Sequence, residues 1–129
     1  MKDFKILLVE DDPINAMVVT KTFKEYSFTI ASTGQSALEK VQHEHFHLIL
    51  MDINLGNSDL DGITVMKKIR ENSRFDKIPI FAITSYDMQE DQEKFLQEGF
   101  DNYILKPISK SNLGDLIEEV RQKMDDSED

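Results

Sequence analysis

Five short apolar runs alternate with longer amphipathic stretches along the chain. The runs are "FKILLV" (4–9), "FTIA" (28–31), "HLILM" (47–51), "IPIFAIT" (78–84) and "NYIL" (102–105). Nearly continuous apolar runs of this length, bounded by polar residues, are typical of strands that are buried on both faces of a sheet. The pattern therefore predicts five β-strands.

Helical periodicity fills the intervals between these runs and continues after the last one. Ala16, Val19 and Phe23 lie at helical spacing behind Asp12, a candidate N-cap, and Gly99 is expected to end the fourth helix. The expected inward-facing residues of the later helices are Ala37, Leu38 and Val41, then Val65, Met66 and Ile69, then Phe95 and Leu96, and finally Leu113, Leu116, Ile117, Val120 and Met124. The pattern predicts one helix after each strand.

Five βα units in series predict an α/β fold with a parallel sheet and helices on both faces. Five units are too few to close an eight-stranded barrel, so we predict an open, doubly wound (βα)5 sheet with strand order 2-1-3-4-5. In this order the first and third strands are neighbours at the switch point, outside which ligands bind.

The chain length of 129 residues fits one domain, which we place at residues 1–124, followed by an acidic, disordered tail at 125–129. The formal net charge of -10 disfavours binding to nucleic acids or anionic membranes. No cysteine is present, which excludes disulfides and thiolate metal sites. The start does not resemble a signal peptide, and no apolar run approaches the ~20 residues of a membrane helix. We expect a soluble, cytoplasmic domain.

Polar side chains follow four of the five predicted strands. Glu10 and Asp11 follow the first, Asp52 ends the third, Thr84 ends the fourth and Lys106 follows the fifth. Each has an ordinary interpretation when taken alone, such as a helix-capping acid or a turn lysine. The carboxyl ends of parallel strands meet at one edge, however, so we expect these side chains to converge.

Converging carboxylates repel one another unless a cation lies among them. Oxygen ligands without histidine or cysteine suit magnesium, which leaves coordination positions for a phosphoryl oxygen. A carboxylate in such a site can act as a nucleophile and form an aspartyl phosphate, and Asp52 lies centrally. Lys106 and Thr84 are placed to neutralise and hydrogen-bond the phosphoryl oxygens.

With these residues the chain resembles the receiver domain of two-component response regulators over essentially its full length. The matching segments are "ILLVEDD", "LILMDIN", "DG", "AITS" and "GFDNYILKPI". The resemblance implies a flavodoxin-like fold and a phosphorylation-activated switch, not an enzyme, with Mg²⁺ as cofactor. It implies a histidine kinase or histidine phosphotransfer protein as phosphodonor, and a downstream protein target or an output domain outside this sequence.

The resemblance also implies a role for each matching residue on the metal side of the site. Glu10 and Asp11 match the family's acid pair, with Asp11 favoured as the direct metal ligand. Asp52 matches the phosphoacceptor and a further metal ligand, and Asn54 would offer its backbone carbonyl to Mg²⁺.

On the phosphoryl side, Thr84 matches the switch hydroxyl and Lys106 the phosphate-facing lysine. Tyr103 matches the aromatic residue that turns inward on phosphorylation. The Lys106-Pro107 bond is expected to be cis, as receivers usually have it.

The chain departs from the family pattern in two places. The segment "LGNSDLDG" (55–62) is two residues longer than usual, with Gly56 where proline is common, and Ser85 replaces the commoner alanine or glycine. We hypothesise that both features change the lifetime of the phosphoryl group.

Other interpretations of these motifs are weaker. A calcium loop beginning at Asn57 needs a glutamate where Lys68 stands. The segment after the first strand lacks the glycines of a nucleotide-binding loop. His43, His45 and His47 are expected at the opposite edge of the sheet as surface residues. The alternative that stays open is a receiver-like interaction module that is never phosphorylated.

Overall fold

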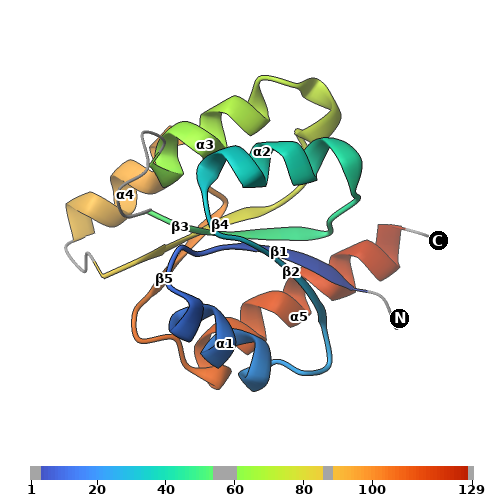
Figure 1. The fold of residues 1–129 in the computed structure, drawn as a ribbon, viewed down its shortest axis with the longest axis vertical. Coiled ribbons are helices and arrows are strands. Elements are labelled where there is room, and N and C mark those ends of the chain that lie inside the picture. The colour runs from blue at the N-terminus through green and yellow to red at the C-terminus, as the bar shows by residue number, and fades with distance from the viewer. Residues whose placement is uncertain (1–3, 54–60, 86–88, 128–129) are drawn as a thin grey trace.

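A parallel β-sheet lies between two layers of helices, with α2, α3 and α4 on one face and α1 and α5 on the other (Figure 1). The computed structural model describes residues 4–53, 61–85 and 89–127. The elements are β1 (Lys5–Val9), α1 (Pro13–Thr22), β2 (Ser27–Ala31), α2 (Gly34–His43), β3 (Leu48–Asp52), α3 (Gly62–Arg70), the 3-10 helix η1 (Ser73–Phe75), β4 (Ile80–Thr84), α4 (Gln89–Glu98), β5 (Asn102–Leu105) and α5 (Lys110–Ser127).

The strand order is β2-β1-β3-β4-β5, and all neighbouring strands are parallel. This confirms the predicted flavodoxin-like fold. The pairing aligns the carboxyl ends of the strands, because Asp52 at the end of β3 pairs with Ile83, and Thr84 at the end of β4 pairs with Leu105.

The strands are apolar throughout because they are covered on both faces. Two hydrophobic clusters lie on the two faces of the sheet, an upper cluster and a lower cluster. In β1, Leu7 and Val9 point into the upper cluster, while Ile6 and Leu8 point into the lower cluster. The upper cluster, below α2, α3 and α4, is Leu7, Val9, Ala31, Ala37, Val41, Phe46, Ile49, Met51, Ile53, Val65, Met66, Ile69, Phe75, Ile80, Ala82, Phe95 and Phe100. The lower cluster, against α1 and α5, is Phe4, Ile6, Leu8, Ala16, Val19, Phe23, Leu48, Leu50, Phe81, Ile83, Ile104, Leu113, Ile117 and Val120.

Helix starts are fixed by side chains that accept hydrogen bonds from the first turn. Asp12 Oδ1 accepts from the N–H of Ile14 at 2.9 Å, which confirms the predicted cap of α1. Asp61 Oδ1 accepts from the N–H of Thr64 at 2.8 Å and caps α3. Gly99 follows the last residue of α4, has a φ of 130° and ends this helix as predicted.

Two details of the sequence-based prediction are wrong. Phe95 anchors α4 in the upper cluster, but Leu96 is 44% exposed, because the next position along a helix is rotated by about 100° away from the buried face. Helix α5 continues to Ser127, past the predicted boundary at residue 124, since extending a packed helix by a few residues is easy once it has formed. Among the described residues, none of the helices has the length and apolar character needed to cross a bilayer.

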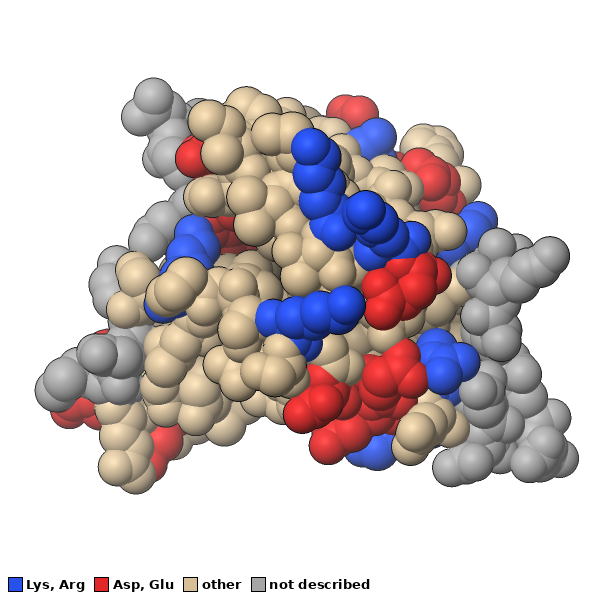
Figure 2. Space-filling view, turned by 90° about the horizontal axis from the view of Figure 1, so that it is seen from below, with Lys and Arg blue, Asp and Glu red and all other residues tan. Residues whose placement is uncertain are grey.

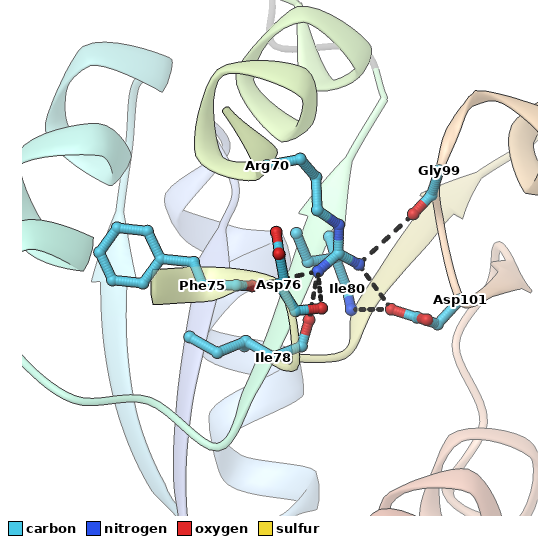
Figure 3. A network of polar contacts seen from close by, with 7 residues as sticks. All are labelled: Arg70, Phe75, Asp76, Ile78, Ile80, Gly99 and Asp101. Atoms are coloured by element: carbon cyan, nitrogen blue, oxygen red, sulfur yellow. Dashed lines mark hydrogen bonds and ion pairs between the residues drawn. The ribbon is translucent and has the colours of Figure 1, made fainter. Parts of the chain in front are cut away.

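Arg70, the last residue of α3, binds several segments at the edge of the sheet where the strands begin (Figure 3). Its Nη2 lies 2.7 Å from Oδ2 of Asp101, which also accepts the N–H of Ile80 at 2.8 Å. Its guanidinium donates further to the backbone carbonyls of Phe75, Asp76, Ile78 and Gly99. The C-terminal end of α3 is therefore fixed to η1, to β4 and to the turn before β5.

Candidate functional site

The carboxyl edge of the sheet gathers the polar residues that the sequence placed there. Glu10 follows β1, Asp52 is the last residue of β3, Thr84 is the last of β4 and Lys106 follows β5. All four come from adjacent strands, and Asp11 extends the group on the β1 side. The switch point between β1 and β3 lies within this group, as expected for a ligand site of an open α/β sheet.

Three of these side chains are almost completely buried. Glu10 is 4% exposed, Asp52 is 2% and Thr84 is 1%, and they are the polar and charged residues of the described chain that are counted as buried. Buried carboxylates are costly unless charges or hydrogen bonds compensate them. Their concentration at one edge is therefore better explained by a site than by packing.

The acids form one cluster. Glu10, Asp11 and Asp52 each place a carboxylate oxygen within 4.8 Å of the other two, and no other such group of three is found in the described parts of the chain. Asp11 is exposed, so the cluster opens to solvent on its side. Oxygen-only donors in this number fit a hard divalent cation such as Mg²⁺.

Lys106 supplies positive charge from the other side. Its Nζ lies 3.1 Å from Oδ2 of Asp52 in a charge-assisted hydrogen bond. Asp52 therefore lies between a carboxylate pair and an ammonium group, as the sequence predicted. This places both signs of charge around the oxygens of one buried carboxylate.

Burial raises the pKa of Glu10 from its ordinary 4.5 to about 7. The N–H of Asp12, which donates to Oε2 of Glu10 at 3.2 Å, opposes this rise, and the negative charge of Asp52 adds to it. A strongly perturbed carboxyl beside a second buried carboxylate is typical of functional sites. We therefore expect a cation bound at this position to compete with a proton.

Some of the remaining predicted residues are described by the structure, and others are not. Thr84 lies at the end of β4 beside the site, and Tyr103 in β5 is half-buried against the upper cluster. The Lys106-Pro107 bond is cis as predicted. Asn54, predicted as a metal ligand through its carbonyl, lies outside the described residues, as does Gly56 of the long segment. Ser85, which follows Thr84, is exposed.

The histidines lie at the opposite edge of the sheet, as expected. His43 and His45 are exposed, whereas His47 is half-buried and stacks on Phe4 with 5.3 Å between ring centroids. Nδ1 of His47 accepts the N–H of Lys5 at 2.9 Å, which gives this ring a structural role. All three histidines line a cavity of about 950 Å³ together with residues of η1 and α5.

The fold and this edge define an open α/β domain with an acidic, lysine-containing site at the carboxyl ends of its strands. The model of the response regulator receiver domain family matches residues 6–118, and the chain belongs to this family. It is a receiver domain, a phosphorylation-activated signalling switch, and the family is one of phosphoacceptor signalling domains.

Relatives of different lengths share this domain. The polar-differentiation response regulator DivK of Brucella ovis is 32% identical over 120 residues, which cover 85% of this chain and 96% of DivK. The transcription factor SKN7 of Saccharomyces cerevisiae is 34% identical over 119 residues, or 90% of this chain and 18% of SKN7. The chain spans less than a fifth of the length of the first curated relatives that it matches.

A solved structure adds information about the metal. The receiver domain of the sensor histidine kinase PA1611 from Pseudomonas aeruginosa PAO1 is 31% identical, with a TM-score of 0.81 over 91% of this chain and 96% of that one. That structure is described with a magnesium ion coordinated in its active site cleft. In the present chain, the acidic cluster of Glu10, Asp11 and Asp52 lies at the carboxyl edge of the sheet.

Proposed function

We propose that Asp52 is the phosphoacceptor of this receiver domain and that it takes its phosphoryl group from the phosphohistidine of a histidine kinase or a histidine phosphotransfer protein. The observation that carries the proposal is the position of Asp52, 3.1 Å from Lys106 and within the acidic cluster at the carboxyl edge. Glu10 and Asp11 do not share this central position between the acids and the ammonium group.

In the transfer step, a carboxylate oxygen of Asp52 attacks the phosphorus of the donor. The new P–O bond forms as the P–N bond breaks, and the leaving imidazole nitrogen keeps the electron pair and takes up a proton. Lys106 neutralises part of the incoming phosphoryl charge, and the hydroxyl of Thr84 donates a hydrogen bond to a phosphoryl oxygen.

The carboxylates of Glu10, Asp11 and Asp52 would hold Mg²⁺, with Asp11 favoured as a direct ligand. The fit depends on three converging carboxylates and on oxygen as the only donor element. When bound, the ion neutralises the negative charge that the acids and the phosphoryl group bring together. The contribution of the Asn54 carbonyl stays a prediction.

We further propose that the added charge of about -1.5 to -2 reorganises the β4 and β5 side of the domain. Thr84 is drawn towards the phosphoryl group, and Tyr103 packs further into the space that opens beside it. Tyr103 is already half-buried against the upper cluster, so it requires only a modest movement. The surface formed by α4, β5 and α5 would then bind a downstream protein target or an output domain.

The donor would dock on α1, which begins at Pro13, two residues after the acid pair. Ile14, Met17 and Val18 are 65%, 46% and 54% exposed and lie opposite the buried Ala16 and Val19. Seen from the side of α1 and α5, the molecule shows a broad area without charged side chains (Figure 2). Exposed apolar residues at i, i+3 and i+4 fit the apolar face of a partner helix.

The test of the proposal is intact-mass measurement after incubation with Mg²⁺ and acetyl phosphate. We expect one phosphoryl adduct in the native chain, loss of the adduct in Asp52→Asn, and its retention in Asp12→Asn, where the cap of α1 is preserved. A native chain without any adduct would contradict the proposal and favour a receiver-like interaction module.

We infer a switch located in the cytoplasm, not an enzyme with a separate substrate.

A further inference from the structure

Gly62, the first residue of α3, lies against the peptide that carries the proposed phosphoacceptor. A Cβ atom at this position would lie 2.3 Å from the carbonyl oxygen of Asp52 and 2.9 Å from Cα of Ile53. The N–H of Gly62 donates to the carbonyl of Ile53 at 3.2 Å, so helix and strand end are directly bonded. The two residues meet across the sequence segment that separates β3 from α3.

The requirement for glycine here is one of space. Among the described residues, the glycine with positive φ is Gly99. Gly62 does not have a positive φ, so its backbone conformation is one that other residues can adopt. The atoms that a Cβ would meet belong to the backbone, which cannot rotate aside as a side chain does. Any larger residue must therefore separate α3 from the end of β3.

The strand side of this contact is held firmly. Asp52 pairs with Ile83 in the sheet, and the N–H of Ile53 donates to the carbonyl of Ile83 at 3.0 Å. Both Asp52 and Ile53 are buried. A displacement of this peptide would disturb the β3–β4 pairing and the carboxylate together.

The helix side is held as firmly. Val65, Met66 and Ile69 are buried in the upper cluster, and Arg70 binds the far end of α3 to η1, β4 and the turn before β5 (Figure 3). Helix α3 therefore has little freedom to retreat from an added methyl group. The resulting displacement is shared by the Asp52–Ile53 peptide.

We propose that Gly62 is a positioning residue for Asp52: its bare Cα allows α3 to pack directly on the Asp52–Ile53 peptide and so holds the Asp52 carboxylate beside Lys106 and Glu10. Gly62 does not itself touch the phosphoryl group. The expected effect of Gly62 on phosphorylation rests on the proposed role of Asp52. The expected effect of Gly62 on cation binding requires only the acidic cluster.

The expected effect of Gly62→Ala follows from the tolerance of the site. A contact of 2.3 Å must lengthen by roughly 1 Å to become acceptable, whereas hydrogen-bond distances vary over only about 0.5 Å. Misplacement of a reacting group by about 1 Å lowers rates by up to roughly 10²-fold. We expect phosphorylation by acetyl phosphate to be about 10- to 100-fold slower, and Mg²⁺ to bind more weakly.

Two control variants separate positioning from general destabilisation. A Cβ at Gly114 would meet Phe23 Cε1 at an ordinary 3.5 Å, so Gly114→Ala should keep native rates. Val65→Ala removes buried volume from the same helix without adding an atom near Asp52. Phosphorylation rate and Mg²⁺ affinity are measured for all variants at a temperature where near-ultraviolet circular dichroism shows each to be folded.

Slower phosphorylation and weaker Mg²⁺ binding in Gly62→Ala, with both retained in Val65→Ala, support the inference. If Gly62→Ala matches Val65→Ala in both measurements, the inference is overturned. If the native chain binds Mg²⁺ but takes no phosphoryl group, only the proposed function is contradicted. The Mg²⁺ affinities of Gly62→Ala and Val65→Ala then test the positioning role of Gly62.

A measurement on the native chain covers the case in which Gly62→Ala does not fold. In a titration of the ¹⁵N-labelled protein with Mg²⁺ alone, the amide resonances of Gly62 and Ile53 should shift with the same midpoint as cation binding, while that of Gly114 stays in place. Unchanged Gly62 and Ile53 resonances at saturation would overturn the inference.

Discussion

The ammonium group of Lys106 lies 3.1 Å from the carboxylate of Asp52 and joins the residue after β5 to the last residue of β3. The side chain of Asp52 is 3% exposed and that of Lys106 is 30% exposed. The pair therefore has a buried anion and a cation that reaches solvent. The ammonium group of Lys106 therefore gives the buried carboxylate of Asp52 the counter-charge that a buried charged group requires.

Replacing Lys106 by methionine should destabilise the fold, because the side-chain stem is kept while a buried carboxylate loses its counter-charge. Removal of one partner from a fully buried pair costs about 3–5 kcal/mol, and the exposure of Lys106 reduces the expected loss to about 1–3 kcal/mol. The free energy of unfolding from urea titrations checks this. Lys24→Met, at an exposed position, serves as control, and equal stabilities of the two variants would contradict the prediction.

Stability without divalent cations should depend on the protonation of Glu10. Burial and the charge of Asp52 raise its pKa from 4.5 to about 7 in the folded state. Between these values the folded chain binds a proton that the unfolded chain does not, so the Glu10 contribution to stability falls as the pH rises from 4.5 to 7 and levels off above. The difference in unfolding free energy between the native chain and Glu10→Gln isolates this trend, and a pH-independent difference would contradict it.

Mg²⁺ binding should show the opposite pH dependence, because the cation requires the ionised carboxylate that the proton neutralises. Affinity is expected to rise by up to about tenfold per pH unit below pH 7 and to change little above it. In Glu10→Gln this rise should be much smaller, which isothermal titration calorimetry across the same pH range can determine.

The sequence predicted the fold and the polar edge because both depend on local patterns. Buried parallel strands are apolar throughout, and the last residue of each strand arrives at the same edge whatever the details of packing. Asp52, Thr84 and Lys106 were therefore placed correctly without coordinates. The exposure of Leu96 was missed because Phe95 and Leu96 are both apolar, and only the packing of α4 against the upper cluster decides which of them is buried.

Contacts between distant backbone atoms could not be predicted in the same way. The "DG" pair indicated that the chain turns into a helix at Gly62, but its close approach to the Asp52 carbonyl depends on the depth at which α3 packs. Arg70 is one of three basic residues in the last turn of α3, and nothing in the sequence distinguishes it from Lys67 and Lys68. Its carbonyl partners come from three other segments, and backbone carbonyls are identical for every residue type.

Arg70→Lys should destabilise the domain although the charge is conserved. The guanidinium reaches several carbonyls and Asp101 at once, whereas an ammonium group cannot span these partners. Loss of two or more such bonds is expected to cost about 2–3 kcal/mol, measured by urea unfolding at neutral pH. Lys67→Gln is the control, because Lys67 is in the same helix as Arg70 and its replacement removes only a surface ion pair with Glu98 of α4. Similar losses in both variants would contradict a special role of the Arg70 network.

Polar substitutions on α1 should slow phosphotransfer from a protein donor but not from a small molecule. Met17→Gln combined with Val18→Ser keeps α1 intact and removes exposed apolar surface beside the acid pair, so transfer from a phosphorylated histidine phosphotransfer domain should fall about tenfold, equivalent to about 1.4 kcal/mol. Acetyl phosphate makes no contact with this surface and should phosphorylate both chains at the same rate. Leu96→Gln, which changes an exposed apolar residue on the other helical layer, is the matched control for the protein donor. An equal decrease in Leu96→Gln would show that the loss of apolar surface anywhere has this effect and would remove α1 as the docking site.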